Sequence, residues 1–251
     1  MKRKEGKQRM DVKDKNKKIR LDRFLANAHI GSRAEVKRYI KDKRIKVNGE
    51  IITDPGLHIS ERDVVTIDDN PVIAHHFVYI MLNKPAGFVS TTAENEPSVL
   101  NLIEHPYINE LHIAGRLDKD VEGLLIITND GDFTHNLISP KKHIEKEYYI
   151  YTRTPVFVSE QMKNDVEKGL EVDGEKFLPG KIRQIDEKVI SITIVEGKYH
   201  QVKKMCKKLG IDWEKIKRIR IGKLRLDETL KPGDWRELSQ EEVRKIFENR
   251  I

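Results

Sequence analysis

The most constraining feature of this sequence is an apolar run that follows a densely charged loop. The run from Gly123 to Thr128 is long enough for a strand buried on both faces. Asp118 lies just before it, between Arg116 and Lys119. We expect these two cations to keep the Asp118 carboxylate ionised at the mouth of the strand. Such a carboxylate can act as a nucleophile or a base, although an aspartate in a charged turn is more often a solvated or capping residue.

The size and charge of the chain point to a protein of about two domains with a polyanionic partner. The 251 residues include 48 Lys and Arg against 41 Asp and Glu, a formal net charge of +7. A basic excess of this kind favours nucleic acid as the partner. Solubility alone would be the simpler explanation, but the basic residues are unevenly distributed, which argues against it.

The composition also excludes several classes of protein. Cys206 is the only cysteine, so an internal disulfide and a Cys/His zinc cluster are both excluded. No carboxylate cluster suggests a metal site. No apolar run approaches the ~20 residues that span a bilayer, and the N-terminus lacks the apolar segment of a signal peptide. We therefore expect a cytoplasmic protein with no metal and no membrane contact.

The first 67 residues divide into a tail and a compact module. Residues 1–18 are rich in Lys and Arg without apolar periodicity, which predicts a disordered basic arm. Residues 19–67 have the pattern of two helices, the second with a capping box from Ser32 to Glu35, followed by a hairpin at Asn48-Gly49 and a final strand. We expect Gly31 to end the first helix.

The second helix of this module carries a basic face suited to the RNA backbone. A solvated face is the alternative, but only Asp42 interrupts the cations, which favours phosphate contacts. The cations are Arg33, Lys37, Arg38, Lys41, Lys43 and Arg44.

The rest of the chain has the pattern of an α+β domain. Residues 68–77 form a polar linker, and residues 78–251 mix strands with isolated helices without a regular βαβ series. We predict strands at residues 78–82, 123–128, 148–152, 180–184, 189–194 and 217–221. We predict helices at residues 98–103, 134–138, 159–168, 199–209 and 239–249.

Two sets of motifs resemble known families. Arg20-Leu21-Asp22, Ser32-Arg33 and Val47-Asn48-Gly49 resemble the S4 RNA-binding domain, an αL-like fold. Gly115-Arg116-Leu117-Asp118 closely resembles the catalytic signature of pseudouridine synthases, and Lys84-Pro85 resembles their first, loop-shaping motif. The order of the motifs is similar to that of the RsuA type of ribosomal-RNA pseudouridine synthase. This resemblance implies an S4 domain followed by a catalytic domain with a mixed, mostly antiparallel central sheet flanked by helices.

The resemblance also implies roles for individual residues. Asp118 would be the nucleophile, Tyr148 of the Lys146-Glu147-Tyr148 motif would stack on a uracil taken out of the RNA, and Lys203 would pair with Asp118. Without the resemblance, a core tyrosine and a surface lysine would be the better interpretations. We expect Arg116 to support the cleft or a phosphate, and His200 to have a structural or RNA-binding role. The other expected RNA contacts, on basic strand or loop edges, are Lys142, Arg218 and Arg220.

The reaction implied is the isomerisation of a uridine within RNA, in which uracil leaves ribose through N1 and rejoins it through C5. It transfers no electrons and no external group, so no cofactor is expected. The sequence from Tyr199 to Lys203 resembles that of the family members that act on the small-subunit (16S) RNA. This resemblance implies a monomer that acts on a small-subunit assembly intermediate. A large-subunit (23S) pseudouridine synthase and a non-catalytic S4-type ribosome-assembly factor stay open.

Overall fold

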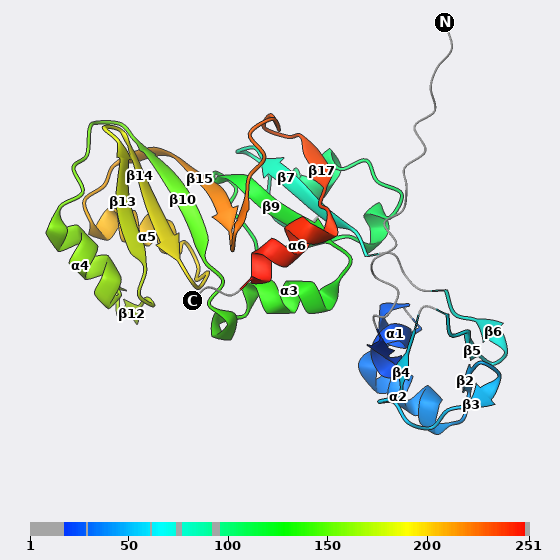
Figure 1. The fold of residues 1–251 in the computed structure, drawn as a ribbon. Coiled ribbons are helices and arrows are strands. Elements are labelled where there is room, and N and C mark those ends of the chain that lie inside the picture. Colours follow the sequence, from blue (N-terminus) through cyan, green and yellow to red (C-terminus); the bar gives the residue numbers. More distant parts are fainter. Residues whose placement is uncertain (1–17, 29, 61, 74–76, 92–95, 249–251) are drawn as a thin grey trace, which may run out of the picture. The chain divides into compact units, whose positions relative to one another are not determined.

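The computed structural model describes residues 18–28, 30–60, 62–73, 77–91 and 96–248. The predicted basic arm therefore lies outside the described residues, except for Lys18. The chain divides into an N-terminal unit up to His76 and a second unit from Phe77 onward (Figure 1). None of the helices in the described ranges is long and apolar enough to cross a membrane.

The N-terminal unit packs two helices against small sheets. The capping box at Ser32 and Glu35 forms as predicted, whereas α1 ends at Asn27, before Gly31. Leu21, Leu25 and other apolar side chains of both helices form the core with the strands. The elements are β1 (Ile19–Arg20), α1 (Leu21–Asn27), α2 (Arg33–Lys41), β2 (Ile45–Val47), β3 (Glu50–Ile51), β4 (His58–Ile59), β5 (Val65–Ile67) and β6 (Asn70–Pro71).

The predicted linker does not begin at Asp68, because the sheet of the N-terminal unit continues past it. β6 pairs with β5, Thr66 facing Pro71, and becomes the outer strand of the order β3-β2-β5-β6. Proline lacks a backbone N–H, so it is tolerated at such an edge. Asp68 itself forms an ion pair with Arg44. Residues 68–71 therefore belong to the module.

The second unit is built on one large mixed sheet. Its strands follow the order β13-β14-β10-β15-β9-β7-β17, with β8 on β9 and β16 on β15. Within the described residues, the β9–β15 pairing of this sheet is parallel and its other pairings are antiparallel. The strands are β7 (Tyr79–Lys84), β8 (His112–Ala114), β9 (Glu122–Thr128), β10 (Lys146–Thr152), β13 (Lys181–Asp186), β14 (Val189–Ile194), β15 (Trp213–Ile221), β16 (Leu224–Arg225) and β17 (Trp235–Glu237).

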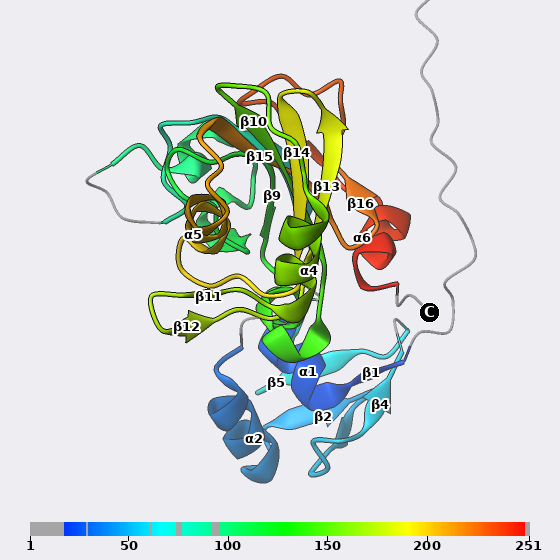
Figure 2. The same cartoon turned by 90° about the vertical axis from the view of Figure 1, so that its left-hand side faces the viewer.

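Helices flank this mixed, mostly antiparallel sheet on both faces, and the expected α+β fold is confirmed. Figure 2 shows α5 on one side of the sheet and α6 on the other. The helices are α3 (Gly131–Ile138), α4 (Glu160–Lys168), α5 (Gln201–Lys208) and α6 (Gln240–Phe247), with short 3₁₀ helices at Val99–Leu102, Ile108–Glu110 and Pro140–Lys142 and a small hairpin of β11 (Glu171–Val172) and β12 (Glu175–Lys176).

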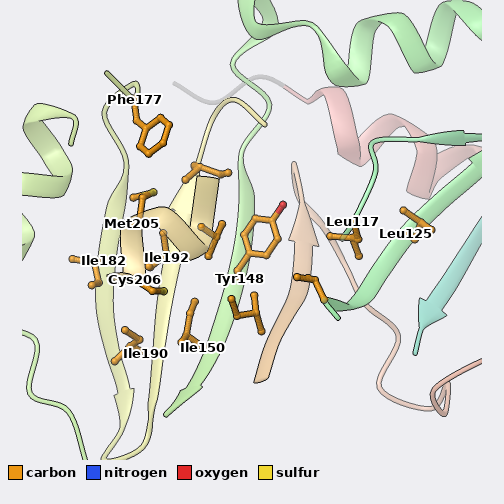
Figure 3. Close-up of a cluster of buried hydrophobic side chains, with 14 of the residues drawn as sticks. Leu117, Leu125, Tyr148, Ile150, Phe177, Ile182, Ile190, Ile192, Met205 and Cys206 are labelled. Atoms are coloured by element: carbon orange, nitrogen blue, oxygen red, sulfur yellow. The ribbon is translucent and has the colours of Figure 1, made fainter. Parts of the chain in front are cut away.

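The apolar run after Asp118 forms β9, which is buried on both faces as its sequence predicts. Leu124 and Ile126 pack with the apolar side chains of α3 and α6, whereas Leu125 and Ile127 join the cluster that contains Tyr148 and α5. This alternation follows from the two-residue period of a strand. Figure 3 shows Tyr148 within the second cluster. The strand thus ties the loop of Asp118 to the core.

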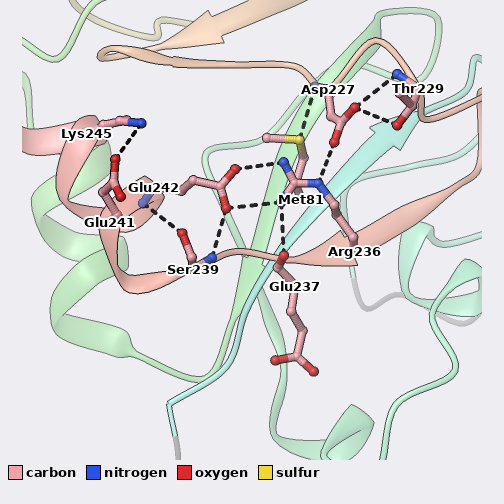
Figure 4. A network of polar contacts seen from close by, with 9 residues as sticks. All are labelled: Met81, Asp227, Thr229, Arg236, Glu237, Ser239, Glu241, Glu242 and Lys245. Carbon is pink, nitrogen blue, oxygen red and sulfur yellow. Dashed lines mark hydrogen bonds and ion pairs between the residues drawn. The ribbon is translucent and has the colours of Figure 1, made fainter. Parts of the chain in front are cut away.

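The last strand and the last helix of the chain are held together by Arg236. Its Nε lies 2.6 Å from Asp227 Oδ2, and its Nη2 lies 2.7 Å from Glu242 Oε1 (Figure 4). Thr229 donates two further hydrogen bonds to Asp227. The hydroxyl of Thr229 and the guanidinium of Arg236 lower the pKa of Asp227 to about 2.

Arg236→Met should therefore lower stability in a pH-dependent way. Carboxylates with a depressed folded-state pKa stabilise the protein above their unfolded values and lose this contribution as the pH falls through the folded ones. We expect the Tm to fall by a few degrees at neutral pH, and the difference from wild type to shrink as the pH drops from 4.5 to about 2. Thermal unfolding of both proteins across this pH range measures the difference in Tm. A difference that does not change with pH would contradict a stabilising role for the ion pairs of Arg236 with Asp227 and Glu242.

Candidate active site

A pocket in the second unit brings together five of the residues predicted from the sequence. Its lining includes Arg116, Asp118, Tyr148, His200 and Lys203. They come from the loop before β9, from β10 and from the start of α5, so three distant segments of the chain meet here. Apolar side chains complete the walls, namely Leu117, Val121, Ile194, Val202 and Ile216.

Lys203 is the cation that pairs with Asp118. Its Nζ lies 3.0 Å from Asp118 Oδ2 and 2.5 Å from Asp120 Oδ1. Burial alone would lower the pKa of Lys203, but the bonds to Asp120 and Asp118 outweigh it and raise the pKa above its ordinary value. The Lys203 side chain is only 17% exposed, so water screens the pair incompletely. The ammonium thus stays charged and orients the Asp118 carboxylate.

The two cations expected to hold Asp118 ionised do not pair with it. Lys119 Nζ lies 3.0 Å from Glu96 Oε2 instead. Arg116 is exposed at the pocket and forms no ion pair with Asp118 in the described part of the chain. This expectation was wrong, because the cation beside Asp118 is Lys203 of α5, a distant segment of the chain that the local order of charges does not reveal.

The loop of Asp118 is held by Lys84, a fully buried lysine at the end of β7. Its Nζ donates to the carbonyl oxygens of Val121 at 2.7 Å, Lys119 at 3.1 Å and Pro85 at 3.0 Å. Burial lowers the pKa of Lys84 to about 8. Ser90 Oγ donates to the Leu117 carbonyl on the other side of Asp118. These bonds fix the backbone around Asp118 and confirm the loop-shaping role expected for Lys84.

Tyr148 forms part of the core and of the pocket wall at once. The residue is 6% exposed, and its ring belongs to the apolar cluster below α5. Its hydroxyl lies 3.4 Å from Nη1 of Arg218, a long contact. The core thus holds the Tyr148 ring at the wall of the pocket.

Arg218 was expected to grip phosphate at an exposed strand edge, and this is wrong. It is 1% exposed, and its guanidinium donates to the carbonyl oxygens of Leu124 and Gly115. β15 is not an edge strand, because it lies between β10 and β9. The backbone of Arg218 on β15 lies so close to Gly123 on β9 that only a glycine fits there. A Cβ added to Gly123, whose φ is +100°, would lie 2.2 Å from the backbone carbonyl oxygen of Arg218. Arg218 is therefore a buried scaffold for the loop of Asp118.

The other expected RNA contacts lie in different places. Arg220 is bound to Glu147 at 2.7 Å and Glu145 at 3.0 Å, so its charge is already compensated and the phosphate role expected for it is not supported. Lys142 is exposed in the 3₁₀ helix that follows α3. The remaining expected contacts are exposed on α2 of the N-terminal unit, namely Arg33, Lys37, Arg38 and Lys41.

His200 occupies a strained position beside Asp118. Its φ of 53° is left-handed, which costs a residue with a Cβ roughly 1–2 kcal/mol. Its Nε2 lies 3.6 Å from Asp118 Oδ2. The next residue, Gln201, anchors the helix start through Glu196, a carboxylate that is 4% exposed. This bond helps to set the direction in which Lys203 enters the pocket.

Asp120 is the site residue that sequence reasoning missed. The only signal was its spacing, two residues after Asp118, and the structure shows that both carboxylates reach the same ammonium. Burial would raise the pKa of Asp120, but Lys203 lowers it below its ordinary value. Within the described residues, no group of three His, Cys, Asp or Glu side chains is placed to hold a metal ion.

Comparison with known proteins decides the family. The profile of the family described as RNA pseudouridylate synthase matches residues 78–208, and that of the S4 domain matches residues 19–65. The chain belongs to the RNA pseudouridylate synthase family. It is thus an RNA pseudouridine synthase, an isomerase acting on RNA, with an S4 RNA-binding domain.

Several relatives of this pseudouridine synthase match along almost their whole length. The uncharacterized RNA pseudouridine synthase YtzG of Bacillus subtilis is 40% identical, over 92% of this chain and 99% of its own. The ribosomal small subunit pseudouridine synthase A of Escherichia coli is 37% identical, over 91% and 100%. A pseudouridylate synthase of known crystal structure is 35% identical in sequence and superposes with a TM-score of 0.66. The match covers 91% of this chain and 99% of that one.

Proposed function

We propose that this enzyme isomerises a specific uridine of small-subunit (16S) ribosomal RNA. The observation that carries the chemistry is the bond of 3.0 Å between Lys203 and Asp118 in a pocket walled by Tyr148. The charged lysine orients the Asp118 carboxylate toward the pocket, as a nucleophile requires. The uridine leaves the RNA stack and its uracil stacks on the ring of Tyr148.

The choice of small-subunit RNA rests on the relatives. Ribosomal small subunit pseudouridine synthases of Salmonella typhimurium and Escherichia coli match from end to end. Relatives without an assigned substrate are equally similar, so a large-subunit substrate is the alternative. The proposal places the enzyme in the cytoplasm as a monomer, on an assembling small subunit.

Incubation with purified RNAs separates these substrates. The enzyme is given 16S rRNA, 23S rRNA and a small-subunit precursor particle, each without modification, and new pseudouridines are mapped in each. The proposal predicts one modified uridine in 16S rRNA or in the particle and none in 23S rRNA. Modification of 23S rRNA alone would overturn the choice of substrate and leave the chemistry intact.

The basic face of α2 should dock the RNA. Replacing Arg33, Lys37 and Arg38 together by alanine should weaken RNA binding. The logarithm of the association constant should also fall less steeply with the logarithm of the salt concentration, the slope shrinking in magnitude by ~0.7–0.9 for each lost phosphate contact. Alanine favours a helix, so α2 should persist. Salt titrations of RNA binding measure the slope.

A second triple variant controls for the loss of net charge. Lys168, Arg183 and Lys188 are exposed in the catalytic unit and do not line the pocket. Their replacement by alanine removes the same charge and should leave the slope nearly unchanged. Equal effects of the two triple variants would mean that the face of α2 is only solvated.

A further inference from the structure

Tyr199 is a large aromatic side chain left in water beside the pocket. The residue is 75% exposed, whereas Tyr148 is 6% exposed. Its chain neighbours Lys198 and His200 both line the pocket. An aromatic ring has much apolar surface to bury, so an exposed one next to an active site is suited to a planar ligand.

One face of the Tyr199 ring is already stacked on His200. The two ring centroids lie 3.8 Å apart and the planes differ by 20°. His200 in turn reaches to 3.6 Å from Asp118. The pocket is thus continued outward by two nearly parallel rings, with the histidine nearer to Asp118.

The backbone holds this arrangement against its own preference. His200 adopts a left-handed conformation, which is unfavourable for a residue with a side chain and concentrates at functional sites. Tyr199 also has Lys204 Nζ 6.0 Å from its ring centroid. The charge of Lys204 is already compensated by Glu175, whose Oε2 lies 2.9 Å away, so the two rings, and not a phosphate contact, favour a bound base.

From this geometry we propose that Tyr199 and His200 form a stacking platform for an unpaired base adjacent to the target uridine. The inference rests on the proposed function, because a uridine that leaves its stack exposes the neighbouring base on one face. The spacing of 3.8 Å between the two rings is close to the ~3.4 Å between stacked nucleotides. A base on Tyr199 extends this stack, and every base has the π face needed, so the platform requires an unpaired nucleotide and no particular sequence.

The test compares four forms of the full-length enzyme on one substrate RNA. They are wild type, Tyr199→Phe, Tyr199→Ala and Phe157→Ala. Phe157 is 84% exposed in the same unit and does not line the pocket, so it controls for loss of an exposed ring. Pseudouridine formation gives kcat/KM, and equilibrium binding gives Kd and its salt dependence.

Tyr199→Ala should lower kcat/KM and weaken binding about 5- to 150-fold, the effect of losing one base–aromatic stack. Tyr199→Phe should keep kcat/KM and RNA affinity near the wild-type values, and Phe157→Ala should match wild type in both. The salt dependence of Kd should be the same in all four forms, because no phosphate contact is lost. A substrate with 2-aminopurine beside the target uridine should lose its binding-induced quenching in Tyr199→Ala alone.

Two outcomes would overturn the platform. One is a Tyr199→Ala variant whose Kd and kcat/KM equal those of wild type. The other is Tyr199→Phe as weak as Tyr199→Ala, which would assign the effect to the hydroxyl. If wild type formed no pseudouridine, the proposed function would fail, and the binding comparison would still report on the platform.

Discussion

Asp118→Asn should abolish pseudouridine formation while the protein stays folded and bound to RNA. The amide has the shape of the carboxylate but no charge, and it is a far poorer nucleophile. Loss of a catalytic nucleophile costs several orders of magnitude, so we expect kcat to fall by at least about 10⁴-fold. Single-turnover kinetics with saturating enzyme measures the chemical step, and thermal unfolding and RNA binding check the rest.

Asp120→Asn is the matched control for this change. It removes a carboxylate from the same loop and the same lysine, yet Asp120 is 65% exposed and does not line the pocket. We expect a much smaller loss of kcat. Substantial turnover by Asp118→Asn, or equal damage by the two variants, would contradict the assignment of Asp118 as nucleophile.

Substitutions of Tyr148 should separate its ring from its hydroxyl. Tyr148→Phe keeps the π face and loses only the long contact with Arg218, so it should retain most of the activity. Tyr148→Ala should lose kcat/KM by about 5- to 150-fold through lost stacking. It should also be destabilised by about 3–5 kcal/mol through the cavity left in the core.

Tyr148→Leu keeps the test sharp if the alanine variant fails to fold. Leucine fills much of the core space but has no ring, so it should fold and still lose activity. Kinetics and thermal unfolding of the three variants are compared. Activity in Tyr148→Leu would make Tyr148 a core residue only, and equal loss in Tyr148→Phe and Tyr148→Leu would mean that the hydroxyl takes part in the chemistry.

The sequence predicts the long buried strands well and the short ones poorly. β9 could be predicted because an apolar run buried on both faces has few other solutions. The short strands β8, β16 and β17 have two or three residues, too few for a recognisable period. β6 could not be predicted because the residues of Asp69-Asn70-Pro71 are typical of a turn, although Asn70 and Pro71 pair with β5.

The candidate site could be predicted in its members but not in its contacts. The motifs locate Asp118, Tyr148 and Lys203, since these residues occupy recognisable positions. The errors concern charges, because a pattern does not show whether a strand is central or at an edge. Arg218 alternates with apolar residues as on an edge strand, yet parallel pairing with β9 buries it.

We expect Asp118 in this pocket to isomerise a uridine of ribosomal RNA in the cell. Pseudouridines are mapped in total rRNA from cells that lack this protein and from the same cells supplied with wild type or with Asp118→Asn. We predict that one pseudouridine of 16S rRNA disappears without the protein, returns with wild type and stays absent with Asp118→Asn. An rRNA map that is identical in all three, or a pseudouridine restored by Asp118→Asn, would contradict it.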